Sequence, residues 1–143
     1  FQWGSKRTGP DLARVGGKYS NDWHVAHMID PQSVVPESVM PRFGFLQRTD
    51  LVVPDIADHL RTNRAVGVPY SDEAIQEAAA DLAAQADPAG DHEALLQRYP
   101  KAVVGDLDGQ PNRLTEMDAL IAYLQILGRM VDFTDVRPED LKQ

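Results

Sequence analysis

The residue best placed to ligate a metal in this sequence is a methionine, Met40, which lies between Val39 and Pro41. Prolines recur through the surrounding segment: Pro31, Pro36 and Pro41. Because proline lacks a backbone N–H and restricts the residue before it, we expect a rigid loop there that presents the thioether. Methionine is more often a core filler, but its soft sulfur also ligates haem iron in electron-transfer proteins. The other methionines fall in helical apolar patterns and are interpreted as core residues: Met28, Met117 and Met130.

Two histidines, His24 and His27, form a second set of metal-ligating side chains. A spacing of three places them next to each other on one side of a helix, as two arms of a metal site would be. A zinc site needs three or four ligands, and no further ligand follows at a suitable spacing. We therefore interpret both as exposed histidines, with a metal site as the alternative.

Composition and motifs exclude several classes of function. Ser, His and Asp are scattered without a nucleophile elbow or a glycine-rich phosphate loop, so no catalytic residues are assigned. The net charge of −8 and the pI near 4.8 argue against nucleic acid as a partner. A chain of 143 residues with 43% apolar content is enough for one globular domain.

The elements that must position these side chains begin with a loop over residues 1–17, which glycines and Pro10 interrupt. Ser20 or Asn21 is expected to cap a short helix that ends by Asp30, just before Pro31. The apolar residues at helical spacing predict its core face: Trp23, Ala26 and Ile29 or Met28.

The rest of the chain predicts an all-α fold. Periodicity and caps indicate helices from about Thr49 to Gly67, Ser71 to Ala86 and Asp91 to Tyr99. The apolar stripe of the second of these is Ile75, Ala78, Ala79, Leu82 and Ala86. The clearest helix runs from Thr115 to Met130, where Thr115 and Asp118 form a start like a capping box. Its apolar stripe is Leu120, Ile121, Leu124, Leu127 and Val131.

Charge is divided unevenly along the chain. Residues 1–48 hold six Lys/Arg and four Asp/Glu, a net of +2, and residues 49–143 hold eight and eighteen, a net of −10. An acidic surface would attract a basic partner by long-range steering. The alternative is that these acids are ordinary helix starts and solvated faces: Asp72, Glu73, Glu77, Asp81, Asp91 and Glu93.

A family resemblance lies in Thr8-Gly9-Pro10-Asp11-Leu12, Gly16-Gly17-Lys18-Tyr19-Ser20 and Met40-Pro41, which are similar to the second half of a class I c-type cytochrome. The longer strings SKRTGPDLARVGGKYSNDWH, DPQSVVPESVMP and LTEMDALIAYLQILG resemble the monohaem subunit (subunit II, CcoO or FixO type) of cbb3-type cytochrome c oxidases. The resemblance implies a cytochrome c-like helical domain with a helical insertion. A Met/His-ligated haem c there relays electrons toward the catalytic subunit.

The resemblance also implies roles for individual residues. Met40 would be the distal iron ligand, and Pro10 would orient the proximal histidine through its carbonyl. The haem pocket would include Gly9, Pro10, Leu12, Tyr19, Trp23 and Pro41. The partners would be the catalytic and dihaem subunits and a soluble basic cytochrome donor, on the periplasmic side of the bacterial inner membrane.

One departure from the family concerns haem attachment. The family attaches its haem through C-x-x-C-H, and this chain has no cysteine. We therefore expect a chain truncated after that motif, without the N-terminal helix and membrane anchor. Such a chain binds no haem, whereas the full-length subunit would carry haem c. The alternative is a haem-free helical interaction or assembly module.

Within this single domain of residues 1–143 we expect four parts. Residues 1–48 would form the haem-pocket half with the methionine loop, and residues 49–112 a helical insertion. Residues 113–132 would form the C-terminal helix, and residues 133–143 a tail. In class I cytochromes the C-terminal helix packs across the N-terminal one, so part of its apolar stripe should lack cover here.

Overall fold

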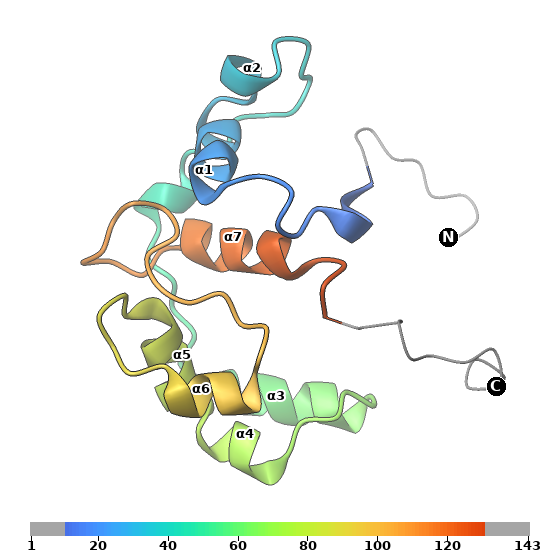
Figure 1. Ribbon diagram of the computed structural model, residues 1–143, viewed down its shortest axis with the longest axis vertical. Coiled ribbons are helices and arrows are strands. Elements are labelled where there is room, and N and C mark those ends of the chain that lie inside the picture. Colours follow the sequence, from blue (N-terminus) through green and yellow to red (C-terminus); the bar gives the residue numbers. More distant parts are fainter. Residues whose placement is uncertain (1–10, 131–143) are drawn as a thin grey trace, which may run out of the picture.

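The computed structural model describes residues 11–130. Within that range it contains seven α-helices and two short 3₁₀-helices, and the only β-type pairing there is an isolated bridge between Asp50 and Thr115. The predicted all-α fold is confirmed. Figure 1 shows the last helix, α7, between two groups of elements: α1 and α2 on one side, and α3 to α6 on the other.

The first group lies around α1 (Asn21–Ile29), with η1 (Leu12–Arg14) before it and α2 (Pro31–Val34) and η2 (Leu46–Arg48) after it. Ser20 caps α1, since its side chain accepts a hydrogen bond from the backbone N–H of Trp23 at 3.2 Å. The predicted loop over residues 1–17 is thus interrupted by the single turn η1. Pro31 opens α2 at a position where its missing N–H costs nothing.

The second group consists of α3 (Ile56–Ala65), α4 (Asp72–Gln76), α5 (Ala78–Ala86) and α6 (Glu93–Arg98). The single helix predicted from Ser71 to Ala86 is wrong in one respect, because it is divided at Glu77. Arg98 of α6 lies across the division and donates to Glu73 of α4 at 3.1 Å and to Asp81 of α5 at 2.9 Å. Within the predicted apolar stripe, Ala79 is exposed.

Helix α7 (Glu116–Ile126) begins with the predicted capping box. The Thr115 side chain accepts from the Asp118 N–H, and the Asp118 side chain accepts from the Thr115 N–H. The helix ends four residues before the predicted Met130, because Leu127 has extended geometry and Gly128 a positive φ of 78°. Gly128 also touches the chain near η1, where a Cβ atom would lie 2.5 Å from the Ala13 carbonyl oxygen.

The core lies where α7 meets α1 and the loop before α7. Leu107, Met117 and Ile121 are its buried centre, and the residues packed against them are Val25, Met28, Leu46, Val103 and Ala122. Within the apolar stripe of α7, Ile121 and Leu124 are buried. The predicted exposure of part of the stripe therefore does not apply to these two residues. Met117 is a core residue as predicted, whereas Met130 is 66% exposed and the prediction for it is wrong.

Helix α1 corrects two further predictions. Its buried side chain is His24, 2% exposed, while Ile29 of the predicted core face is exposed. His27 is half-buried, so neither histidine is the exposed residue that the spacing indicated. The interpretation failed because apolar periodicity assigns no histidine to a core face. No helix among residues 11–130 is long and apolar enough to span a bilayer.

Candidate functional site

Four rings gather at the start of α1. Tyr19 and Trp23 stack at 3.9 Å between centroids with a 14° interplanar angle. Edge-on contacts join Trp23 to His24 at 5.5 Å and to His27 at 4.5 Å, and Tyr19 to His24 at 6.0 Å. The structure therefore brings together Tyr19 and Trp23, two of the residues that the resemblance assigned to the haem pocket.

A glutamine of α7, Gln125, holds the loop that carries this ring cluster. Its Nε2 donates to the Tyr19 carbonyl oxygen at 2.9 Å and to Asn21 Oδ1 at 2.8 Å. Its Oε1 accepts from the Gly17 backbone N–H at 2.9 Å. Every polar atom of this buried amide has a partner, so the loop is fixed to α7 across more than a hundred residues of sequence.

Gly16 permits the close approach of loop and helix. Its N–H donates to the Leu127 carbonyl oxygen at 3.0 Å. A Cβ atom there would lie 2.5 Å from the carbonyl oxygen of Gln125 and 2.6 Å from that of Leu127. The sequence shows the glycine pair but not what approaches it, and so this contact and Gln125 were both missed.

His24 is the polar residue of the cluster that lacks a partner. Its Nε2 is buried and forms no hydrogen bond with any described residue. Burial, and to a lesser extent the neighbouring His27, lowers the pKa of His24, and burial also lowers the pKa of His27. The His24 imidazole is consequently neutral at pH 7.

The predicted methionine loop is present over residues 35–43, which contain no helix or strand, and Met40 is half-buried within them. The start of the segment differs from the prediction, because Pro31–Val34 form the short helix α2. The Met40 N–H donates to Ser38 Oγ at 3.2 Å. Two contacts fix the loop to the end of α1, an ion pair of 3.1 Å between Arg42 and Asp30 and a 2.7 Å hydrogen bond from the Phe43 N–H to the Met28 carbonyl oxygen. The ring cluster and the thioether loop are thus held at opposite ends of one helix.

The remaining predicted site residues are not brought into the ring cluster. Pro41 is exposed beside Met40, and Leu12 is 49% exposed on η1. Gly9 and Pro10 lie outside the described residues, so the role assigned to the Pro10 carbonyl stays a prediction.

The residue types present fit the distal side of a haem. A thioether in an irregular loop is a soft iron ligand, and aromatic rings suit the porphyrin plane. The apolar side chains Leu12, Val39 and Phe45 are exposed in this part of the chain, and Val39 is 80% exposed. The buried, unpartnered nitrogen of His24 indicates that one polar group of the site bonds something beyond the described residues.

A cluster of carboxylates lies before α7, where oxygens of Asp106, Asp108 and Asp118 are within 4.8 Å of one another. Such a group could hold a cation, but each carboxylate already accepts hydrogen bonds from backbone N–H groups. Asp118 Oδ1 accepts from the Leu107 and Asp108 N–H groups, both at 3.0 Å, and Asp106 accepts from the Gly109 N–H at 2.8 Å. We interpret the cluster as the organiser of this loop.

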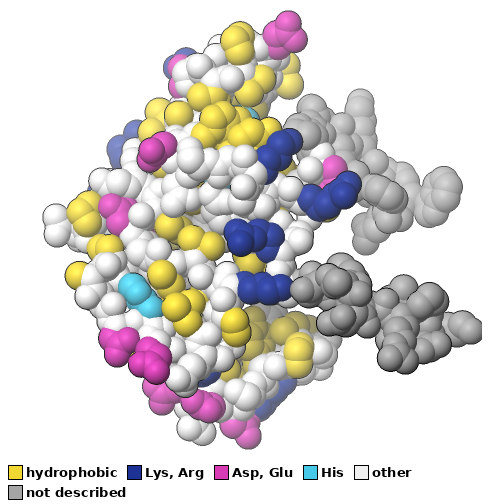
Figure 2. Space-filling view, in the orientation of Figure 1, with side chains coloured by type: hydrophobic (Ala, Val, Ile, Leu, Met, Phe, Trp, Pro, Cys, Tyr) yellow, Lys and Arg dark blue, Asp and Glu magenta, His cyan; other side chains and the backbone are white. Residues whose placement is uncertain are grey.

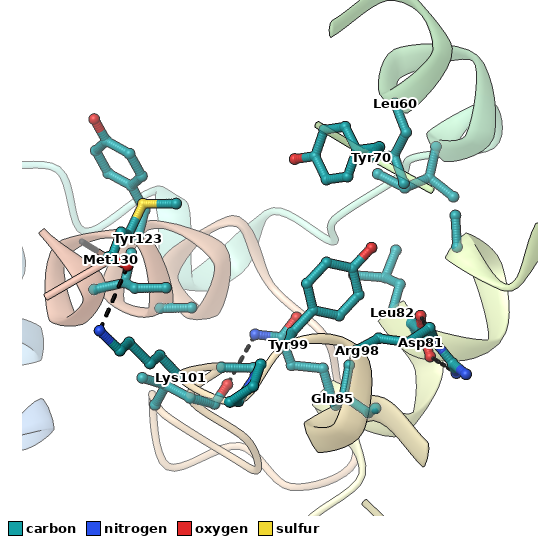
Figure 3. A pocket seen from close by; sticks show the side chains of 18 residues that line it. Leu60, Tyr70, Asp81, Leu82, Gln85, Arg98, Tyr99, Lys101, Tyr123 and Met130 are labelled. Carbon is teal, nitrogen blue, oxygen red and sulfur yellow. Dashed lines mark hydrogen bonds and ion pairs between the residues drawn. The ribbon is translucent and has the colours of Figure 1, made fainter. Parts of the chain in front are cut away.

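A cavity of about 640 Å³ lies between the α3–α6 group and α7 (Figure 3). Its lining is mostly apolar, with the rings of Tyr70, Tyr99 and Tyr123 and the ion pair between Arg98 and Asp81. Asp81 is 6% exposed, so its interpretation as a solvated charge is wrong. The exposed acids nearby form a group at this end of the molecule, and Lys and Arg gather closer to α7 (Figure 2).

Comparison with known proteins found one family. The model described as "Cytochrome C oxidase, mono-heme subunit/FixO" matches residues 1–131. No curated protein matches the chain at a significant level.

Proposed function

We propose a function from one premise: the chain belongs to the FixO family, the mono-haem subunits of cytochrome c oxidase, since the family match covers residues 1–131. Membership makes it part of an electron-transfer subunit of an oxidase complex with other subunits. Our proposal adds the cbb3 type of the oxidase and a c-type haem ligated by methionine in the full-length subunit. The position of Met40 in an irregular, anchored loop is the observation that supports this most directly.

Each side chain has a physical task in this proposal. Met40 would hold the haem iron through its thioether, a ligand that favours ferrous iron and so raises the reduction potential. The haem supplies the one-electron chemistry, and the chain positions it and keeps water away. Tyr19 and Trp23 stack to form an aromatic wall that Gln125 holds in place. Gly9, Pro10, Leu12 and Pro41 complete the proposed pocket.

The proposed partners are the catalytic and dihaem subunits, and the proposed location is the periplasmic side of the bacterial inner membrane. A soluble basic cytochrome is the proposed donor, because exposed acids gather over α3 to α6 (Figure 2). Glu73 and Asp81 pair with Arg98, and Asp72 pairs with Arg64 at 2.6 Å. Glu77 and Asp91 are exposed and are therefore better candidates for steering.

A haem-free interaction or assembly module is the second candidate function. The absence of cysteine from these 143 residues favours it, because a covalent thioether link needs a thiol. The complete open reading frame discriminates the two, since a C-x-x-C-H motif there favours the cytochrome. The chain of 143 residues by itself should give no band with a peroxidase haem stain on a denaturing gel.

The proposed function is tested by Met40→Ala in the full-length subunit. The haem should stay attached, while the Met–iron charge-transfer absorption of the oxidised protein disappears. Met130→Ala is the matched control, because that side chain is exposed and lies on the far side of α7 at the cavity. Survival of the absorption band in the Met40 variant would show that another residue is the ligand.

A further inference from the structure

The least explained group in the described residues is the imidazole of His24. The ring is 2% exposed, and its Nε2 has no hydrogen-bond partner there. Leaving a buried polar atom unpaired costs about 1–3 kcal/mol, so native proteins rarely keep one without a reason. A leucine or phenylalanine at this position of α1 would fill the space without that cost.

No described residue around His24 forms a hydrogen bond with its Nε2. Tyr19 and Trp23 meet the imidazole edge-on at 6.0 Å and 5.5 Å, and these are ring contacts. Two acceptors of the preceding segment, the Tyr19 carbonyl oxygen and the Asn21 side chain, each accept a hydrogen bond from Gln125. The partner of Nε2 therefore comes from outside this set of contacts.

Two features concern the chemistry of that partner. A neutral imidazole that carries its proton on Nε2 is a hydrogen-bond donor, and a carboxylate is the acceptor that forms the strongest bond with it in a dry site. Two cations also lie beside the preceding loop: Lys18 Nζ is 5.0 Å from the centroid of the Tyr19 ring, and the Arg129 guanidinium would lie 3.2 Å from a Cβ atom at Gly17. Asp22 is the acid in the first turn of α1, so the donor on His24, and not the net charge, is what favours a carboxylate.

We propose that His24 Nε2 binds a propionate carboxylate of the haem and so positions the cofactor against the Tyr19–Trp23 stack. This inference rests on the proposed function, which supplies the haem. Tyr19 and Trp23, whose rings contact His24, are themselves half-buried, so this side of the ring cluster is open to a ligand. His24 is a positioning residue here, and iron ligation stays with Met40.

The bond has a consequence for the iron. A donor on the propionate partly neutralises its charge, and a less negative environment favours the ferrous state. Loss of the donor should therefore lower the equilibrium constant for haem reduction, roughly tenfold for a change of about 1.4 kcal/mol in the electrostatic interaction between the propionate and the iron.

The experiment uses the full-length haem-bearing subunit with three variants: His24→Leu, His24→Gln and His27→Gln. In His24→Leu we expect a shifted propionate bending mode in resonance Raman spectra and the roughly tenfold lower reduction constant, with the Met–iron band unchanged. The side-chain amide of His24→Gln can donate in place of Nε2 and should restore both readouts. His27→Gln is the control one turn along α1 and should match the wild type.

Unchanged Raman spectra and an unchanged reduction constant in His24→Leu overturn the proposal. That result is expected if Nε2 instead donates to a backbone carbonyl oxygen of the chain. If His24→Leu fails to fold, a measurement on the wild-type protein tests the proposal instead. The ¹⁵N resonance of His24 Nε2 should differ between this haem-free chain and the full-length subunit, and identical resonances also overturn the proposal. A wild-type subunit without the Met–iron band contradicts the ligation by Met40 separately.

Discussion

Buried polar side chains lie at the start of α7 and at the start of α1, but their hydrogen bonding differs. Before α7, Asp118 accepts from the N–H groups of Leu107, Asp108 and Thr115 at 3.0 Å each. Thr115 Oγ1 in turn donates to Asp108 at 2.8 Å. Before α1, Gln125 satisfies the loop backbone, whereas His24 Nε2 has no partner among residues 11–130.

This difference separates a self-contained structural site from the site that we propose to be functional. A polar network whose members are all paired stabilises the fold and needs no ligand, and it is sensitive to the loss of any member. A site with an unpaired buried nitrogen and exposed apolar side chains gains stability when a ligand pairs with the nitrogen and covers those side chains. The carboxylate cluster, which has the residue types of a metal site, therefore belongs to the first class.

The largest expected effect comes from breaking the complete network with Asp118→Ala. The loss of the shared acceptor leaves the Leu107 and Thr115 N–H groups unpaired, at about 1–3 kcal/mol each, while the Asp108 N–H keeps its 3.2 Å hydrogen bond to Asp106 Oδ1. We expect the free energy of unfolding of this chain to fall by about 3–5 kcal/mol, measured by urea denaturation.

The matched control for that variant is Asp58→Asn, an exposed acid of α3 that pairs with Arg61. Exposed pairs contribute about 0–1 kcal/mol, so its unfolding curve should stay close to the wild type. Equal losses in the two variants would contradict the structural role of the carboxylate network.

A smaller effect is expected from Gly16→Ala, which disturbs the loop that carries the ring cluster. The added Cβ atom would meet two backbone oxygens of α7 within 2.6 Å, and backbone cannot move aside like a flexible side chain. We expect a loss of about 2–3 kcal/mol in urea denaturation and a changed Trp23 environment in fluorescence.

Gly44→Ala is the comparison for this variant, since its Cβ atom would lie 3.7 Å from Ile29, an ordinary contact. The two variants should therefore differ in stability. A Gly16 variant as stable as the Gly44 variant, with unchanged fluorescence, would mean that loop and helix are not held together as described.

The smallest effect concerns pH. Burial lowers the pKa of His24 below its value of about 6.5 in the unfolded chain, so the unfolded state binds more protons between the two values. The stability of this chain should be full above pH 6.5 and decrease as the pH falls through that value toward the lower pKa of the folded state.

Urea midpoints between pH 7.5 and pH 5 measure this slope, which should be reduced in His24→Gln. It should persist in His59→Gln, because His59 is exposed on α3. An identical slope in wild type and His24→Gln would assign the pH dependence to other groups.

Local features of the fold could be predicted from the sequence because they depend on residues within one helical turn. Ser20 caps α1, Thr115 and Asp118 form a capping box, and the prolines around Met40 prevent a regular element there. Helix caps and proline restrictions act between neighbours in the chain, so no tertiary contact is needed to find them.

The end of α7 and the division of the predicted helix at Glu77 could not be predicted from helix caps and proline restrictions. Apolar residues continue past Ile126, yet the helix ends because Gly128 turns the chain against Ala13. A helical stripe continues from Ile75 through Ala86, yet α4 and α5 are separate, with Arg98 of another helix bound to both.

The sequence by itself determined the helical class, the family and the loop position of Met40, since these reside in motifs and short-range patterns. Only the tertiary structure decided which polar residues are buried and which of those are paired. Gln125 meets Gly17 from 108 residues away, and His24 is enclosed by rings whose arrangement depends on that contact. Whether a side chain is buried depends on residues that pack against it from distant parts of the sequence, so a local sequence pattern does not predict it.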